Sequence, residues 1–377
     1  MNADGGPRTP HGLVIGKCYP PHAGHEVLVR AAAAASERVT VLVLAHDVET
    51  LPLELRVAWL AETVADLPHV TVHGADDPHP VDFDDPAIWD LHVAEFRRAI
   101  AEVTDVPVTA VFSSEDYGDE LARRFGAVHV AVDPDRSQAP ISGTRVRADP
   151  AGSWHLLPPP VQAGLARRVV VIGAESTGTT TVADGLSAAL QARGGPFAAT
   201  RWVPEYGRER TAAKLAELRA EARATGRPKP TMAELDWPTS EFVHIARTQN
   251  ALEDEAARAG GPVLVCDTDA FATGIWHERY RGEPSAEVDA LARPHPLYLV
   301  THHDGVPFVQ DGLRDGEHVR AWMTDRFLDA LATTGRTHVV LRGSADERVA
   351  AALEAVERDL ATAWSFADPL TAPTPDP

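Results

Sequence analysis

Cysteine is nearly absent from this sequence of 377 residues, whose two thiols belong to Cys18 and Cys266. Their spacing matches no metal-binding pattern, so a cysteine-based metal site is excluded. Each cysteine also lies beside a motif at an expected buried turn, where a small core residue is a more common role than a nucleophile. We therefore predict that both thiols are buried in hydrophobic cores.

Positive charge is also scarce, since 35 Lys and Arg residues stand against 55 Asp and Glu residues, for a net charge of −20. Proteins that bind nucleic acid without sequence preference need clustered Lys and Arg side chains for phosphate contacts. A nucleic-acid partner of this kind is therefore excluded. Any polyanionic substrate must be met by local positive charge.

Long apolar runs are lacking as well. No run is long enough to span a bilayer, and the polar start of the chain, with its prolines and glycines, has no signal-peptide pattern. We expect a cytoplasmic protein without a membrane partner.

The remaining composition is ordinary for a globular protein, with 44% hydrophobic and 24% charged residues. The length suffices for two domains with substantial cores. Apolar segments typical of buried strands alternate with helical segments in two successive series, which predicts an α/β protein with two doubly wound parallel-sheet domains. We expect the domains at 11–150 and 168–365, with a proline-containing linker at 151–167 and a disordered tail at 366–377.

The strand positions matter because ligands of such sheets bind at the carboxyl ends of the strands. The apolar runs predict strands at 13–15, 39–45, 110–112, 128–132, 168–172, 262–266, 297–300 and 337–341. The intervening segments predict helices at 22–36, 56–64, 88–103, 181–191, 211–225, 241–258 and 345–364. Residues 68–86 are rich in Asp, His and Pro and are interpreted as a long solvated loop, whose histidines are too irregularly spaced for a metal site.

The first motif that carries chemistry follows the first expected strand. Gly16 permits a sharp turn, and the sequence His22-Ala23-Gly24-His25 then opens an alanine-rich helix. A helix amino-terminus attracts phosphate, and two imidazoles there can donate hydrogen bonds to a phosphoryl group as charge develops on it. This is the chemistry of nucleotidyl transfer, although capping or solvent-facing histidines are the simpler alternative. Lys17 directly follows the turn and is placed to meet a phosphate.

A second motif, ISGTRVR, spans residues 141–147 near the end of the first expected domain. Arg147, and to a lesser degree Arg145, can pair with triphosphate oxygens, and Ser142 and Thr144 offer hydroxyl donors. A capped helix start with no ligand would use the same residues. Because this motif and VFSSEDYG both follow strand ends, we expect them at the same crevice as the paired histidines.

The second domain opens with the sequence GAESTGTTT after a buried strand, which matches a phosphate-binding loop at every position except the lysine, where Thr179 stands. Backbone N–H groups can still cradle phosphates, and the Thr180 hydroxyl can still reach Mg²⁺. Loss of the lysine removes a contact worth several kcal/mol at a transition state. The predicted ligand-binding residues of this loop are Gly173, Glu175, Ser176, Thr177, Gly178, Thr179, Thr180 and Thr181.

Acidic and basic residues elsewhere in the second domain fit a phosphate site. The sequence WVPEYGRE offers Glu205, Tyr206 and Arg208 together. An apolar strand ends in Asp267 and Asp269, an arrangement in which a carboxylate holds Mg²⁺ or accepts a hydroxyl proton.

A polar segment further along the chain is a candidate lid. Residues 311–315, with Arg320 after them, could bring Arg314 over the phosphates, although an exposed loop is the simpler reading. His302 and His303, which follow another strand, are interpreted as loop residues rather than metal ligands.

Taken in order, these motifs resemble the NadR-type bifunctional enzymes of NAD synthesis, in which a nicotinamide-mononucleotide adenylyltransferase precedes a ribosylnicotinamide kinase. The resemblance covers about residues 11–365 and rests on GKCYPPHAGH, VFSSEDYG, DPDRSQAPISGTRVR, GAESTGTTT, WVPEYGRE, CDTD and DGLRD. Some relatives carry an amino-terminal helix-turn-helix domain, and we expect none here because the first strand begins close to residue 11.

The resemblance implies roles for individual residues. His22 and His25 would stabilise the α-phosphate of ATP while nicotinamide mononucleotide attacks it, and pyrophosphate would leave with Mg²⁺. Ser142, Thr144 and Arg147 would hold the triphosphate. In the second domain, Asp267 would be the catalytic acid, Glu205 the acid that contacts nicotinamide riboside, and Arg314 the lid arginine.

Three hypotheses follow. The first is a bifunctional enzyme whose kinase tolerates Thr179, with Arg314 or Arg320 supplying the charge. The second is an adenylyltransferase whose other domain binds nucleotide without transferring phosphate and so acts as a sensor or binding module. The third is a nucleotidyltransferase for a different phosphorylated acceptor. The sequence leaves assembly into a homo-oligomer open.

Overall fold

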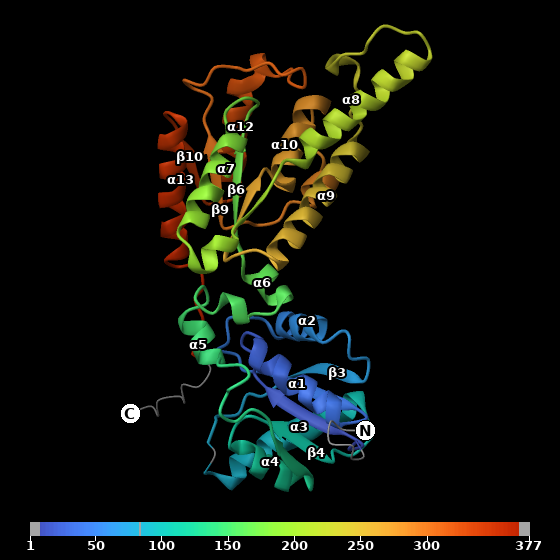
Figure 1. Cartoon of the computed structure of the whole chain (residues 1–377), viewed down its shortest axis with the longest axis vertical. Coiled ribbons are helices and arrows are strands. Elements are labelled where there is room, and N and C mark those ends of the chain that lie inside the picture. The colour runs from blue at the N-terminus through green and yellow to red at the C-terminus, as the bar shows by residue number, and fades with distance from the viewer. Residues whose placement is uncertain (1–7, 83, 369–377) are drawn as a thin grey trace. The chain divides into compact units, whose positions relative to one another are not determined.

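The chain forms two compact units in the computed structural model, which describes residues 8–82 and 84–368 (Figure 1). The first unit comprises Met1–Val161 together with Trp364–Pro377, and the second comprises Gln162–Ala363. The chain therefore passes from one unit to the other twice, once inside the predicted linker and once after the last helix. Both units contain a five-stranded sheet whose strand pairs are all parallel, which confirms the predicted fold class.

The first unit has the strand order β3-β2-β1-β4-β5, the order of a Rossmann-like half. Its strands are β1 Gly12–Gly16, β2 Val39–Ala45, β3 Val70–Asp76, β4 Ala110–Ser113 and β5 Val128–Ala131. Its helices are α1 Ala23–Ala35, α2 Leu53–Thr63, α3 Pro86–Val103, α4 Tyr117–Phe125 and α5 Gly143–Ala148, and a 3-10 turn, η1, spans Trp154–Leu156. Helix α6, Pro159–Leu165, spans the boundary between the units.

Strand β1 is apolar along its length because both of its faces are buried. Leu13 and Ile15 belong to one hydrophobic core, whereas Val14, which points to the opposite face, belongs to a second. Strand β2 divides in the same way, with Leu42 in the first core and Val41 in the second. The central strand of the sheet is thus fixed from both sides, and its carboxyl end is a rigid base for the loop that follows.

The prediction that residues 68–86 form one long loop is wrong over residues 70–76, which form the edge strand β3. Polar residues alternate with apolar ones here, since an edge strand buries only part of its surface. Gly74 allows close packing, because a Cβ atom there would lie 3.0 Å from the Leu53 side chain of α2. His73 pairs with Glu102 on the surface. Phe83 lies outside the described residues.

The second unit has the strand order β10-β9-β6-β8-β7. Its strands are β6 Arg167–Gly173, β7 Arg201–Val203, β8 Val263–Asp267, β9 Leu297–Thr301 and β10 His338–Leu341. Its helices are α7 Thr179–Ala192, α8 Tyr206–Ala224, α9 Thr239–Arg258, α10 Ala270–Arg281, α11 Ala286–Asp289, α12 Arg320–Thr333 and α13 Ala345–Leu360, with 3-10 turns η2 Gly195–Ala199, η3 Met232–Glu234 and η4 Glu317–Val319. The far end of α8 projects away from this unit (Figure 1).

Both cysteines are buried, as predicted: Cys18 follows β1 and Cys266 lies in β8. Burial raises the pKa of the Cys18 thiol to about 12 and that of Cys266 well above its usual value. Neither thiol is therefore a thiolate nucleophile at neutral pH.

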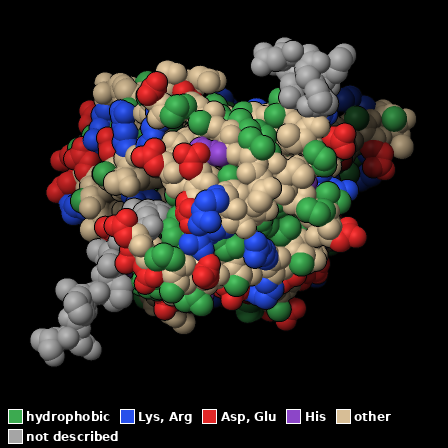
Figure 2. All heavy atoms as spheres, turned by 90° about the horizontal axis from the view of Figure 1, so that it is seen from below, with side chains coloured by type: hydrophobic (Ala, Val, Ile, Leu, Met, Phe, Trp, Pro, Cys, Tyr) green, Lys and Arg blue, Asp and Glu red, His purple; other side chains and the backbone are tan. Residues whose placement is uncertain are grey.

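The surface carries a mixture of charges. The face in Figure 2 shows acidic, basic and apolar side chains interspersed, rather than one continuous basic field. Across residues 8–82 and 84–368, no helix is both long and apolar enough to cross a bilayer.

Candidate active sites

The two histidines of the first motif form a capping box at the start of helix α1, in which each side chain accepts a backbone hydrogen bond. The Nδ1 atom of His22 accepts a hydrogen bond from the backbone N–H of Gly24 at 3.1 Å. The Nδ1 atom of His25 accepts one from the backbone N–H of His22 at 3.2 Å. An imidazole that accepts at Nδ1 carries its hydrogen at Nε2 when neutral. Both rings, whose centroids lie 3.9 Å apart, therefore present an Nε2–H donor.

The surroundings of these rings favour the neutral form. Burial lowers the pKa of His22 to about 2, with further lowering by His25, Arg136 and Arg147. Burial and then the Arg136 charge lower the pKa of His25 to about 4. At neutral pH both rings are thus uncharged donors, beside two arginines whose charge attracts a polyanion.

A single pocket at the carboxyl end of β1 gathers all the predicted ligand-binding and catalytic residues of the first unit: Gly16, Lys17, His22, Gly24, His25, Ser142, Thr144 and Arg147. The second motif lies at the start of α5, where the Ser142 hydroxyl accepts a hydrogen bond from the backbone N–H of Arg145. Arg147 donates to the carbonyl of Tyr19 at 3.0 Å and to the Thr144 hydroxyl at 3.3 Å. The capped helix start and the cationic pocket wall are therefore the same feature.

Lys17 is held by a buried carboxylate that the sequence did not reveal. Its Nζ atom lies 2.9 Å from Glu49, whose other oxygen is 2.9 Å from the guanidinium of Arg56. The side chains of Glu49 and Arg56 are each only 1% exposed. Arg56 also donates to the backbone carbonyls of Lys17 and Leu44. Two cations thus share one carboxylate, which fixes the loop after β1 in place.

Arg136 is a pocket residue that sequence reasoning missed. It lines the same cavity, and its charge lowers the pKa of both His22 and His25. It pairs with Glu115 and donates to the carbonyl of Ile141. The loop that carries it is shaped by Asp133, whose carboxylate accepts hydrogen bonds from three successive backbone N–H groups, those of residues 137, 138 and 139. An arginine in a loop has no local signal that marks it as functional.

A serine, a histidine and an aspartate in this unit have the order of a hydrolase triad. Ser113 Oγ lies 2.9 Å from His129 Nε2, and His129 Nδ1 lies 2.7 Å from Asp119. The Ser113 hydroxyl, however, donates its hydrogen to the carbonyl of Glu115 and is only 2% exposed. A triad serine must give its proton to the histidine. These residues therefore tie the β4–α4 loop together and do not form a nucleophile.

The second unit builds a phosphate-type loop between β6 and α7. Ser176 has φ +59° and Gly178 has φ +88°, so the backbone turns through the left-handed region twice. The Thr177 hydroxyl hydrogen-bonds to the Ala174 carbonyl and to Thr301 at 2.7 Å each. From behind, the buried Arg348 donates to the carbonyl of Thr177 at 2.9 Å. The loop is thus rigid even though Thr179 stands at the lysine position.

Two acids lie beside this loop. The Thr180 hydroxyl donates to Asp267 at 2.6 Å, at the carboxyl end of β8. Burial raises the pKa of Asp267, and the hydrogen bonds from Thr180 and Thr179 offset only part of this rise. Burial, and then the Asp267 charge, raise the pKa of Glu205 to about 7. Hydroxyl and carboxylate oxygens are the ligands that Mg²⁺ prefers, so Thr180 and Asp267 fit a magnesium site.

The predicted lid contacts the phosphate loop directly. Arg314 donates to the Ser176 hydroxyl at 3.3 Å, and Arg320 donates to the Ser176 carbonyl at 3.1 Å. Arg208 and Arg314 share the carboxylate of Asp311. Arg314 and Arg208 line the pocket, whereas Arg320 does not. Two guanidinium groups therefore face the place where the phosphates of a nucleotide would lie.

Comparisons with known proteins agree with this geometry. A family model described as an AAA domain matches residues 168–348, and one described as the citrate lyase ligase C-terminal domain matches residues 11–78. The trifunctional NAD biosynthesis/regulator protein NadR of Escherichia coli (strain K12) is 25% identical over 318 residues, which cover 80% of this chain and 71% of that protein. The corresponding NadR of Salmonella typhimurium is 25% identical over 316 residues, with the same shares covered.

Two solved structures share the fold. The crystal structure of a NadR protein in complex with NR superimposes with a TM-score of 0.67 at 21% identity, covering 93% of this chain and 96% of that one. The complex of NadR with NAD and AMP-PNP gives a TM-score of 0.64 at 21% identity over the same shares. The chain resembles NadR over most of its length. The matches confirm this predicted resemblance and the predicted fold, with a nucleotidyltransferase-like first domain and a kinase-like second domain.

The pocket of the kinase-like second unit contains nine of the predicted residues: Gly173, Glu175, Ser176, Thr179, Thr180, Glu205, Arg208, Asp267 and Arg314. Five others do not line it: Thr177, Gly178, Thr181, Tyr206 and Asp269. Thr177 is buried behind the loop, and Thr181 faces solvent on α7. Tyr206 hydrogen-bonds to His244. Asp269 is fully buried, where it caps α10 and accepts a hydrogen bond from Tyr298, so it is a structural residue.

The same pocket continues into an aromatic end that sequence reasoning missed, formed by Trp237, Phe242, Trp276 and Tyr280 with Met232. The Nζ atom of Lys214 lies 4.9 Å from the centre of the Trp237 ring and forms a salt bridge with Glu241. These residues come from α9, α10 and the segment before α9. Because these residues are scattered along the sequence, their spacing does not indicate that they line one pocket.

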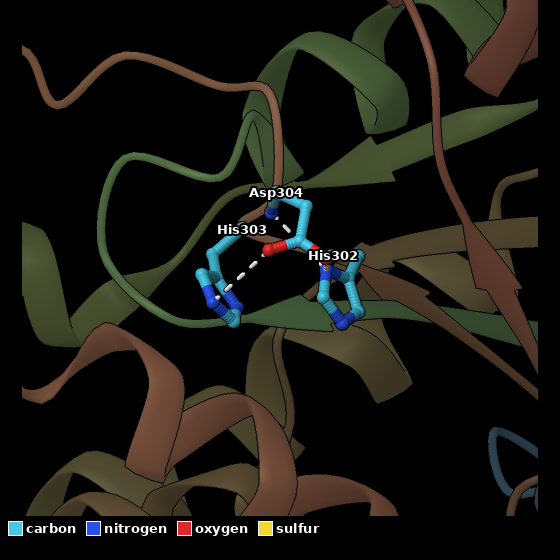
Figure 3. Close-up of side chains that lie close together, drawn as sticks. All are labelled: His302, His303 and Asp304. Atoms are coloured by element: carbon cyan, nitrogen blue, oxygen red, sulfur yellow. Dashed lines mark hydrogen bonds and ion pairs between the residues drawn. The ribbon is translucent and has the colours of Figure 1, made fainter.

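One further cluster of possible metal ligands lies after β9. Ligand atoms of His302, His303 and Asp304 lie within 4.8 Å of one another, and Figure 3 shows the Asp304 carboxylate between the two imidazoles. That carboxylate also accepts a hydrogen bond from Arg342 at 2.8 Å, and His302 Nδ1 accepts the backbone N–H of Asp304. His303 Nδ1 contacts Thr324 at 3.0 Å. A metal would have to displace these partners, so the interpretation as loop residues stays our prediction.

Proposed function

We propose that the first unit transfers AMP from ATP to nicotinamide mononucleotide, giving NAD and pyrophosphate. The observation that carries the proposal is the pair of neutral imidazoles, His22 and His25, which aim Nε2–H donors into a pocket walled by Arg136 and Arg147. Donors placed where charge develops on a phosphoryl group stabilise its transition state. The acceptor is inferred from the similarity to NadR.

The proposed step balances without a general base. A 5′-phosphate oxygen of nicotinamide mononucleotide forms a bond to the α-phosphorus of ATP. The bond from that phosphorus to the bridging oxygen of the β-phosphate breaks, and its electron pair leaves with pyrophosphate. His22 and His25 donate hydrogen bonds to the α-phosphoryl oxygens as their negative charge grows. Arg147, Ser142 and Thr144 hold the β- and γ-phosphates, which makes pyrophosphate a better leaving group.

The acceptor is tested by offering ATP and Mg²⁺ with a panel of phosphorylated acceptors and following pyrophosphate release. Nicotinamide mononucleotide is expected to give the highest kcat/KM, with NAD as the product. Turnover of another phosphorylated compound, with none for nicotinamide mononucleotide, would contradict the proposed acceptor and favour a different nucleotidyltransferase.

For the second unit, we propose a site that binds ATP and nicotinamide riboside, with Mg²⁺ held by Thr180 and Asp267. The pyridinium ring of the riboside carries a positive charge, which the faces of aromatic rings attract, and the aromatic end of the pocket supplies Trp237, Trp276 and Tyr280. Glu205 lines the same pocket, near Asp267 and Arg208, where a carboxylate can accept hydrogen bonds from ribose hydroxyls.

We propose that phosphate transfer in this unit is slow. Arg208 and Arg314 supply positive charge, but both are paired with Asp311 and neither is a mobile lysine that follows the transferring group. Chromatography after incubation with ATP, Mg²⁺ and nicotinamide riboside tests this. Slow appearance of the mononucleotide supports the proposal. Tight binding of the riboside with no phosphorylation at all would favour the alternative, a binding module that acts as a sensor.

A further inference from the structure

The first unit includes a piece of the carboxyl-terminal end of the chain, residues 364–368, which we call the 364–368 segment. The sequence predicted disorder from residue 366, but Phe366 packs edge-on against Tyr19, with ring centroids 5.8 Å apart and planes at 86°. The carbonyl of Ser365 accepts a hydrogen bond from the Thr50 hydroxyl at 3.1 Å. The ring centroids of Trp364 and Trp154 lie 6.3 Å apart. Residues 369–377 lie outside the described residues.

Tyr19 connects this segment to the nucleotide pocket. Its ring is only 1% exposed, and its hydroxyl lies 2.6 Å from the Thr50 hydroxyl and accepts the Thr50 backbone N–H at 2.9 Å. The guanidinium of Arg147 lies 5.3 Å from the centre of the same ring, and the Tyr19 carbonyl accepts a hydrogen bond from Arg147. The 364–368 segment therefore contacts the Tyr19 ring directly and reaches the Tyr19 hydroxyl only through Thr50. Arg147 contacts the same tyrosine through its ring and its carbonyl.

Arg147 has few other constraints. Among the described residues, its other hydrogen-bond partner is the Thr144 hydroxyl at 3.3 Å, on the same short helix α5. A guanidinium that must meet a triphosphate loses less entropy on binding if it is already fixed. Burial lowers the pKa of Arg147, and the nearby charge of Asp368 opposes that shift. The orientation of Arg147 thus depends on Tyr19, which in turn is buttressed by Phe366.

We propose that the 364–368 segment is a positioning element of the nucleotidyl-transfer site, which holds Tyr19 and thereby orients Arg147 toward the triphosphate of ATP. The proposal rests on the function proposed for the first unit. It makes residues that follow the kinase-like domain in sequence part of the first catalytic site. None of these residues touches the reacting atoms, so the segment acts through Tyr19 and Arg147 alone.

Steady-state kinetics of Phe366→Ala test the proposal. An aromatic pair is worth enough to change binding by about three- to tenfold. We therefore expect KM for ATP to rise by about that factor, while KM for nicotinamide mononucleotide stays unchanged. The Phe366→Tyr variant keeps the ring edge and is expected to restore the KM of the unchanged chain. Riboside binding by the second unit serves as the internal control and is expected to stay constant.

Two truncations place the effect in the segment. A chain that ends at Ala363 removes all five residues and is expected to show at least the ATP effect of Phe366→Ala. A chain that ends at Asp368 keeps them and is the matched control, with the KM of the full chain. If Phe366→Ala lowers the melting temperature of the first unit, Phe366→Leu, which keeps apolar volume without a ring, is expected to show a smaller rise in KM for ATP.

The outcomes separate this inference from the function on which it rests. If the full chain forms no NAD from ATP and nicotinamide mononucleotide, the proposed function fails. If the full chain forms NAD and both the Phe366→Ala variant and the chain ending at Ala363 keep its KM for ATP, the positioning role is overturned. A rise in the KM for both substrates together would also overturn it, because that result indicates general loosening of the unit.

Discussion

Thr180 donates a 2.6 Å hydrogen bond to Asp267, although the residue before it in the phosphate loop, Thr179, stands where such loops have lysine. The loop has thus kept the hydroxyl and carboxylate pair suited to Mg²⁺ and lost the cation that follows the transferred phosphate. Its backbone remains ordered by Thr177 and Arg348. Among the described residues that line the pocket, Arg208 and Arg314 are the positively charged side chains.

Restoring the lysine is expected to restore fast phosphate transfer. In Thr179→Lys, the new ammonium group can contact the phosphates, and one charge-assisted contact at a transition state is worth about 10²-fold or more in rate. Product formation from ATP and nicotinamide riboside, followed by chromatography, measures the gain. Thr181→Lys is the matched control, because that side chain faces solvent outside the pocket. Equal rates in Thr179→Lys and the unchanged chain would show that the threonine is not the limiting feature.

Riboside binding to the second unit is expected to strengthen as pH rises through about 7. Burial raises the pKa of Glu205 from its usual acidic value to about 7, so the free site holds a proton below that pH. A cationic ligand favours the ionised carboxylate, and its binding therefore releases a proton near neutrality. Titration calorimetry in buffers of different ionisation enthalpy measures this release. Glu205→Gln should abolish the pH dependence, whereas the neighbouring Glu209→Gln should leave it intact.

Arg136 is expected to contribute to adenylyl transfer, although no role for it was predicted from the sequence. In Arg136→Met the pocket loses a cation beside both imidazoles, and loss of one charged contact to a phosphoryl transition state lowers kcat/KM for ATP by about 10²-fold. The matched control is Arg145→Met, since Arg145 donates to the Pro140 carbonyl and does not line the pocket. A loss of similar size in both variants would mean that Arg136 has only a structural role.

The Arg56–Glu49 pair is expected to stabilise the first unit much more than a surface pair does. Arg56→Met leaves Glu49 buried with Lys17 as its remaining cation and should lower the free energy of unfolding by about 3 kcal/mol. Arg98, whose side chain is 59% exposed, also pairs with carboxylates, and Arg98→Met should cost less than about 1 kcal/mol. Denaturant unfolding compares the two. Similar losses would contradict the role assigned to the buried pair.

The sequence predicted well those features that local patterns specify. Strands β1, β2 and β6 are short apolar runs, and the capped starts of α1 and α5 need only the few residues that precede each helix. The strand β3 was missed because its residues alternate between polar and apolar, and an edge strand needs no continuous apolar run.

Features that depend on tertiary contacts could not be predicted in this way. Arg136 becomes a pocket residue only because its loop returns beside α1, and the aromatic end of the second pocket draws on three separate segments. Asp267 and Asp269 are two positions apart after the same strand, yet the first lines the pocket and the second caps α10 in the core. Nothing in the local sequence distinguishes the two acids.

His22 and His25 are the residues on which the proposed adenylyl transfer depends most. The most direct measurement is the initial rate of NAD formation from ATP, Mg²⁺ and nicotinamide mononucleotide. The unchanged chain and His155→Ala, which alters an exposed histidine of the same unit, are expected to form NAD and pyrophosphate in equal amounts. His22→Ala and His25→Ala are each expected to lose about 10²- to 10³-fold in kcat, with only the small drop in melting temperature that loss of a helix cap of about 1 kcal/mol causes. Unaltered NAD formation in both variants would contradict the assignment of the imidazoles as the transition-state donors.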